Sequence, residues 1–102
     1  MKKSPLKRSP LKLQVNLHYD NAMYTGTVTN LSEHTMHIET EMIIPFKSEF
    51  KVRVPLIDEV IEVPVRVRTL EKTDRYCNCM GVELINPPPY YLEFVSRMSS
   101  IY

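Results

Sequence analysis

The feature that most constrains the fold is a series of short segments in which apolar and polar residues alternate with a period of two. In the first of them, Leu13, Val15 and Leu17 alternate with polar neighbours, as in a strand that buries one face. The alternation recurs in residues 23–29, 36–40, 50–54, 61–68 and 79–84. Short strands separated by polar turns predict an all-β dominated protein, a six-stranded antiparallel β-barrel whose closure leaves no free edge.

Pro64 departs from this pattern because it stands inside the fifth predicted strand. Proline has no N–H group to donate to a ladder of hydrogen bonds. We therefore expect that strand to contain a bulge or to lie at an edge of the sheet.

The last predicted strand is followed by a helix signal. Asn86 suits a helix cap, and the prolines at 87–89 suit a first helical turn. Apolar residues then recur at helical spacing: Tyr91, Phe94, Val95, Met98 and Ile101. A helix this short is marginal alone in water, so we predict a C-terminal α-helix that packs this face on the barrel. A dimer interface is the alternative use of the same face.

Charge is distributed unevenly along the chain. The formal net charge is +1, yet five basic residues precede Asp20, the first acidic residue: Lys2, Lys3, Lys7, Arg8 and Lys12. A short basic segment either binds anions or remains a solvated tail. The sequence Ser-Pro-Leu-Lys occurs twice in it, and each proline keeps its serine out of helical geometry. We predict a flexible basic arm over residues 1–12 and a single barrel domain with its helix over residues 13–102.

The sequence contains no segment suited to crossing a membrane. Its longest uninterrupted apolar run is Met42–Phe46, whereas a spanning helix needs roughly 20 residues. The basic start resembles the first part of a signal peptide, but no apolar stretch follows it. We therefore expect a cytoplasmic protein without a membrane span. The near-neutral charge argues against general nucleic-acid binding.

Residue patterns for catalysis are missing from the sequence. Gly26 and Gly81 are the only glycines, so no glycine-rich phosphate loop is possible. Ser32 lacks the flanking sequence of a nucleophile elbow. Cys77 and Cys79 lack the further cysteine and histidine spacing of a zinc site, and we interpret them as reduced thiols. We expect neither an enzyme nor a metal site.

Two groups of residues remain that suit an anionic ligand. Lys7, Arg8 and Lys12 stand directly before the first predicted strand. Asn30 and Ser32 stand in the turn expected between the second and third strands. The first group supplies positive charge, and the second supplies an amide and a hydroxyl that donate and accept hydrogen bonds.

In this arrangement the chain resembles the PilZ domain family. That family has an Arg-x3-Arg segment before the first strand, an Asp/Asn-x-Ser-x-x-Gly turn after the second, and a Gly-Val-Glu-Phe-like strand before a C-terminal helix. The corresponding residues here are Arg8-x3-Lys12, Asn30-x-Ser32-x-x-Thr35 and Gly81-Val82-Glu83-Leu84. The resemblance covers about Lys7 to Met98 and implies a PilZ-like six-stranded barrel with a C-terminal helix.

The resemblance further implies a bacterial receptor or adaptor for the second messenger cyclic di-GMP, with no enzymatic activity, no cofactor and an unidentified protein partner. It assigns nucleotide binding to six residues: Lys7, Arg8, Lys12, Asn30, Ser32 and Thr35. The residue types fit this ligand, because arginine matches a guanine edge and the lysines attract phosphates. We expect the arm to close over the nucleotide and thereby change contacts with the partner.

Two departures from the family pattern bear on binding. Lys12 replaces the second arginine and keeps its charge but loses the planar guanidinium. Thr35 replaces a glycine, and a threonine is strained if that position requires a positive φ. The alternative function is a PilZ-like protein–protein adaptor that does not bind cyclic di-GMP, and a third possibility is nucleic-acid binding by the arm.

Overall fold

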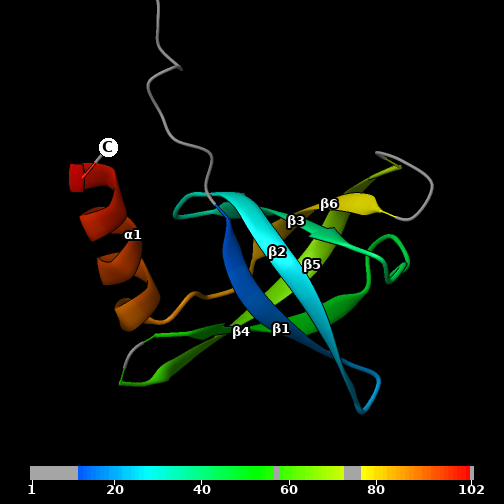
Figure 1. The fold of residues 1–102 in the computed structure, drawn as a ribbon, viewed down its shortest axis with the longest axis horizontal. Helices are drawn as coiled ribbons and strands as arrows, with labels where there is room; N and C mark the ends of the chain where they lie inside the picture. Colours follow the sequence, from blue (N-terminus) through cyan, green and yellow to red (C-terminus); the bar gives the residue numbers. More distant parts are fainter. Residues whose placement is uncertain (1–11, 57, 73–76, 102) are drawn as a thin grey trace, which may run out of the picture.

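The computed structural model describes residues 12–56, 58–72 and 77–101, with side chains as far as Arg97. Six antiparallel strands form a closed barrel in the order β1-β2-β3-β6-β5-β4, and one helix follows them (Figure 1). The elements are β1 (Leu13–Tyr19), β2 (Ala22–Leu31), β3 (Thr35–Thr40), β4 (Glu49–Pro55), β5 (Val60–Lys72), β6 (Asn78–Leu84) and α1 (Pro89–Ile101). The predicted six-stranded barrel with a C-terminal helix is confirmed.

The turn between β1 and β2 illustrates how local sequence fixes the strand register. Asp20 and Asn21 have φ of 54° and 62°, the left-handed conformation that asparagine and aspartate tolerate best among residues with a side chain. A two-residue turn of this kind matches the twist of paired strands. It places Tyr19 opposite Ala22, so that Val15 and Leu17 face the interior while Asn16 and His18 face outward.

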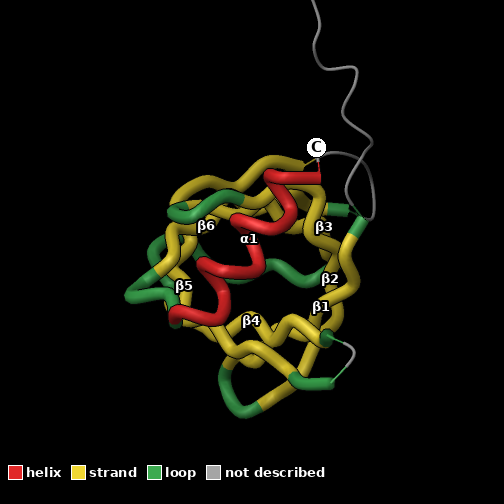
Figure 2. The backbone as a smooth tube through the Cα atoms, turned by 90° about the vertical axis from the view of Figure 1, so that its left-hand side faces the viewer, coloured by secondary structure: helices red, strands yellow, loops and turns green. Residues whose placement is uncertain are grey.

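The core lies inside the barrel and beneath the helix. Alternate strand residues are buried there, and they are mostly valine, isoleucine, leucine and methionine. Helix α1 lies across one opening of the barrel (Figure 2). Its residues Tyr91 and Val95 are buried in the core and Phe94 is partly buried against it, so the predicted packing face is confirmed at these positions. The side chains of Met98 and Ile101 lie outside the described part.

The expectation for the strand that contains Pro64 is met by a bulge and not by an edge. The fifth strand is bulged, but between Val67 and Thr69 rather than at Pro64, and the closed barrel leaves no edge. The Pro64 carbonyl accepts a hydrogen bond from the Ile85 N–H just beyond the start of the β5–β6 ladder. Because the N and O atoms of a strand residue point to the same neighbour, the missing N–H of Pro64 lies on the β6 side and removes no hydrogen bond from the β4–β5 ladder.

The predicted helix cap is also corrected. Asn86 has a φ of 47° and lies in the turn before the helix, which begins at Pro89. The Pro88 carbonyl accepts hydrogen bonds from Tyr91 and Leu92. Pro89 is therefore the first helical residue, where proline loses no helical hydrogen bond. Within the described residues, no helix is long and apolar enough to cross a membrane.

Candidate functional site

The centre of the candidate site is the turn between β2 and β3, which folds around the hydroxyl of Ser32. The Ser32 Oγ accepts hydrogen bonds from the backbone N–H groups of His34 (3.2 Å) and Thr35 (3.1 Å). It lies 3.0 Å from the Thr35 Oγ1. The Ser32 N–H closes the turn by donating to the Thr35 carbonyl at 2.9 Å. The Ser32 hydroxyl is thus engaged by its own turn, and either hydroxyl can be the donor in the contact between Ser32 and Thr35.

Two other elements hold this turn in place. The Tyr91 hydroxyl of α1 donates a 2.7 Å hydrogen bond to the Ser32 carbonyl. The backbone N–H of Leu84, at the end of β6, donates to the His34 carbonyl at 2.9 Å. Burial raises the pKa of Tyr91 above its ordinary range, so it stays protonated and able to donate. The turn is thus fixed from the helix and from the barrel wall.

Asn30 points to the solvent because of a bulge in β2. Val28 is paired with Ile38 and Asn30 with His37, which leaves Thr29 as an extra residue. Val28 faces the interior, and strict alternation would turn Asn30 inward as well. The bulge reverses this direction, and Asn30 is exposed. Its amide makes no hydrogen bond with a described residue and is open to a ligand.

The structure places four of the six predicted site residues and brings them to one outer corner of the barrel. Lys12 is exposed and directly precedes Leu13, which is paired with Val28 at the start of the bulge. Lys12 therefore stands beside the β2 segment that carries Asn30. Lys7 and Arg8, and the predicted arm up to residue 11, lie outside the described residues.

Thr35 occupies its position without backbone strain. It is exposed at the start of β3 and is not among the residues with positive φ. The strain expected if the glycine position needed a left-handed backbone is therefore not found here. Its cross-strand neighbour on β6 is Glu83, whose carboxylate accepts a 2.8 Å hydrogen bond from Arg68. A hydroxyl and a carboxylate thus stand side by side on the outer wall.

His37 is a further member of this corner that the sequence analysis did not assign to it. It is exposed and lies between Asn30 on β2 and Gly81 on β6 in the strand register. A Cβ on Gly81 would collide with the Thr69 hydroxyl and would come within 3.6 Å of the His37 Nε2. A larger residue at position 81 would therefore force the Thr69 side chain to shift. A sequence signal for His37 was available. It stands between the apolar residues Met36 and Ile38, which face inward, so alternation turns His37 outward on β3.

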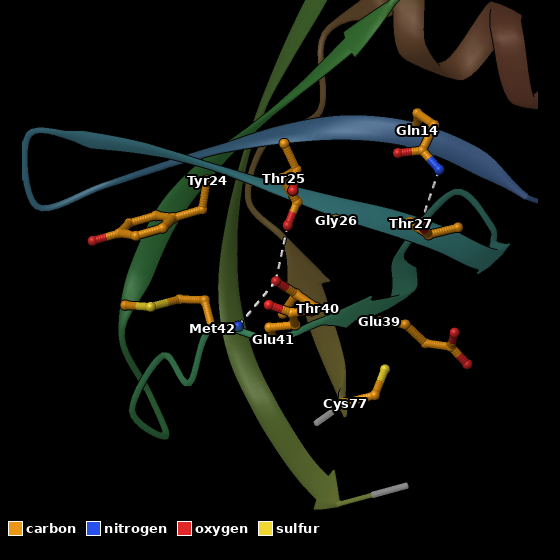
Figure 3. Close-up of a pocket in the computed structure, with 10 residues that line it drawn as sticks. All are labelled: Gln14, Tyr24, Thr25, Gly26, Thr27, Glu39, Thr40, Glu41, Met42 and Cys77. Atoms are coloured by element: carbon orange, nitrogen blue, oxygen red, sulfur yellow. Dashed lines mark hydrogen bonds between the residues drawn. The ribbon is translucent and has the colours of Figure 1, made fainter. Parts of the chain in front are cut away.

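A separate hollow of about 490 Å³ lies away from this corner, where β2 and β3 diverge (Figure 3). The Thr40 hydroxyl donates to the Thr25 carbonyl at 2.9 Å and accepts from the Met42 N–H at 3.2 Å, which fixes its wall. The hollow carries the carboxylates of Glu39 and Glu41 and no described cationic side chain. This charge does not suit a phosphate ligand.

The cysteines lie near that hollow rather than near the candidate site. Cys77 lines it, and Cys79 on β6 is flanked across the strands by Glu39 and Glu71. Burial and these carboxylates raise the pKa of Cys79, which keeps it in the unreactive thiol form. Within the described ranges, no three histidine, cysteine, aspartate or glutamate side chains are grouped so as to hold a metal ion.

Comparison with known proteins bears on the whole arrangement. No curated protein and no solved structure matches the chain. The family model of the PilZ domain matches residues 6–98, a range that includes the basic segment before β1, the β2–β3 turn, the barrel and most of α1. The chain belongs to the PilZ domain family.

Proposed function

We propose that this protein is a receptor and adaptor that binds cyclic di-GMP at the corner formed by Lys12, Asn30 and the Ser32–Thr35 turn. Membership of the PilZ family implies a receptor or adaptor for this nucleotide. The observation that carries the proposal is the bulge in β2, which turns Asn30 outward beside Lys12. A buried Asn30 would have left the motif without its base-reading group.

The groups at this corner match the chemistry of the nucleotide. A carboxamide both donates and accepts, so Asn30 can pair with a guanine edge. Lys12 offers a positive charge to a phosphate, and Arg8 on the arm would add a planar guanidinium that matches the O6 and N7 atoms of guanine. We assign the Thr35 hydroxyl to the ligand, because the Ser32 hydroxyl already accepts two backbone hydrogen bonds within its own turn. The role of Ser32 is to shape the turn.

Binding at this corner would be transmitted by two routes. The arm, residues 1–12, would close over the nucleotide and present a new surface to a partner protein. The Tyr91–Ser32 hydrogen bond would carry any displacement of the turn to α1. In this proposal the protein is not an enzyme. It changes its contacts with a partner in response to the nucleotide.

The second candidate function is an adaptor that does not bind the nucleotide. Two observations favour it. Lys12 stands where the family has an arginine, and the Ser32 hydroxyl is engaged by its own turn. Each would lower affinity, because a lost bidentate contact or an unavailable hydroxyl removes part of the binding free energy.

Isothermal titration calorimetry of the full chain with cyclic di-GMP separates these functions. The receptor predicts saturable binding that Arg8→Ala and Asn30→Ala weaken by about tenfold or more each. The matched control is Asn16→Ala, since Asn16 is also exposed on the outer wall but lies on β1 beside β4. Affinity should also fall as salt is added. Absence of binding in the parent protein would favour the adaptor.

A further inference from the structure

A second hollow, of about 350 Å³, lies on the outer wall of the barrel and is lined by Phe46, Lys47, Arg66 and Arg68. It is formed by the turn before β4 and the outward side chains of β5. The Lys47 N–H donates to the Val67 carbonyl, and the Val67 N–H donates to the Ser48 carbonyl, both at 2.9 Å. The backbone N–H and carbonyl of Val67 therefore both hold the turn against β5.

The turn presents an aromatic ring to solvent. Phe46 is 54% exposed, although a phenylalanine is ordinarily among the most buried residues. The Lys47 ammonium lies 5.7 Å from the centre of this ring, within the range of a cation–π contact. Lys47 adopts a φ of 73°, a conformation unfavourable for a lysine. A strained residue directly beside an exposed ring points to a binding role more than to a folding role.

The other lining residues bring two guanidinium groups to the same place. Arg66 contacts Glu49 at 2.6 Å and Arg68 contacts Glu83 at 2.8 Å, in each case through one nitrogen. Both glutamates lie outside the lining of the hollow. A guanidinium has five N–H donors, so each arginine keeps donors for a second carboxylate. Exposed ion pairs of this kind are weak and yield readily to a competing anion.

We propose that this hollow binds an acidic segment of a partner protein, with its carboxylates on Arg66, Arg68 and Lys47 and an apolar side chain on Phe46. Arginine and aromatic residues are enriched among the hot-spot residues that contribute most of the binding free energy of protein interfaces. The charge of the lining is entirely positive, so the complementary partner is acidic. This proposal goes beyond nucleotide binding and stands whether or not the Ser32 corner binds a ligand.

Two other ligand classes fit the same hollow less well. The arginines could match the O6 and N7 atoms of guanine, but the lining has no acceptor side chain for its N1–H and N2–H groups. An anionic membrane is flat and would approach the carboxylates of Glu49 and Glu83 beside the cations. A peptide can place its charges only over the cations.

The test is fluorescence polarisation of the full chain with a labelled peptide in which glutamate alternates with leucine. Arg68→Glu should weaken binding by about tenfold or more, and Phe46→Ala should weaken it clearly. The matched controls are Arg97→Glu, an exposed arginine on α1 that also pairs with a glutamate, and Ile43→Ala, an exposed apolar residue nearby. Both controls should bind as the parent does. Lys47→Glu replaces Arg68→Glu if circular dichroism shows that the latter is unfolded.

The proposal is overturned if the peptide does not bind, or if Arg97→Glu weakens binding as much as Arg68→Glu does. It is also overturned if the amide signals of Phe46 and Lys47 respond to cyclic di-GMP or to phosphatidylglycerol vesicles and not to the peptide. A response to the peptide alone, lost in Arg68→Glu, supports it.

Discussion

The Tyr91 hydroxyl donates a 2.7 Å hydrogen bond to the backbone carbonyl of Ser32. The two residues are 59 positions apart in the sequence, on α1 and in the turn directly after β2. Tyr91 is fully buried and Ser32 is partly exposed, so this contact is partly shielded from water. The helix that closes the barrel and the turn of the candidate nucleotide site therefore share one bond, which makes the folding stability of the helix and the geometry of the site interdependent.

Tyr91→Phe removes this donor while keeping the ring. We expect the free energy of unfolding to fall by about 1–3 kcal/mol, because the Ser32 carbonyl loses a shielded partner. Urea denaturation followed by circular dichroism measures the change. The control is Tyr90→Phe, whose side chain is exposed and should be near neutral. Equal losses in both variants would mean that the hydrogen bond contributes nothing specific.

The same tyrosine predicts a pH dependence of stability. Burial raises the pKa of Tyr91 in the folded state, while the unfolded chain titrates at about 10. The folded state therefore holds its proton where the unfolded state loses it, and stability falls as pH rises above about 10. Denaturation between pH 8 and 11 (roughly the range around the unfolded value) should show a steeper decline in the parent than in Tyr91→Phe. Parallel declines would contradict the assignment.

Thr35→Gly restores the family residue and tests whether Thr35 is strained. Since Thr35 has no positive φ, glycine should relieve nothing and should lower stability by about 1 kcal/mol through chain entropy. Thr35→Ser keeps the hydroxyl beside Ser32 and should lose less. Thermal unfolding of the two variants gives the comparison. A gain in stability for Thr35→Gly would show that the threonine backbone is strained after all.

Gly81 is predicted to be required by Thr69 rather than by its own backbone. Gly81→Ala should cost about 1–3 kcal/mol of stability, because the new methyl group collides with the Thr69 hydroxyl on β5. The double variant Gly81→Ala with Thr69→Ala should recover most of this loss. Denaturant titration of the single and double variants measures the coupling. If the two losses simply add, the collision is not the reason for glycine here.

The sequence predicted the barrel because every strand alternates and each turn contains polar residues. Leu13, Val15 and Leu17 needed no tertiary information to be assigned to one buried face, and the same holds for Tyr91 and Val95 on the helix. The positions of the bulges could not be predicted from this alternation. They depend on how two strands of unequal length close into one barrel. Pro64 indicated a bulge in the fifth strand but not its position between Val67 and Thr69.

The candidate site was predicted in part. The Asn30–Thr35 turn followed from a motif, and the structure brings Lys12 to it. The hydrogen bonds and neighbours of these side chains could not be predicted. Residue type does not reveal that the Ser32 hydroxyl is used by its own turn or that Thr35 faces Glu83. His37 was passed over because its neighbours across the strands, Asn30 and Gly81, are defined by pairing alone.

The measurement that tests the central claim most directly is an amide NMR titration of the full chain with cyclic di-GMP. We predict saturable shifts concentrated at Lys12, Asn30, Ser32 and His37, carried on to Tyr91 in the parent and reduced there in Tyr91→Phe. His37→Ala should weaken the binding, while His18→Ala, an exposed histidine on β1, should not. Unchanged spectra at millimolar nucleotide, or shifts confined to other surfaces, would contradict the account.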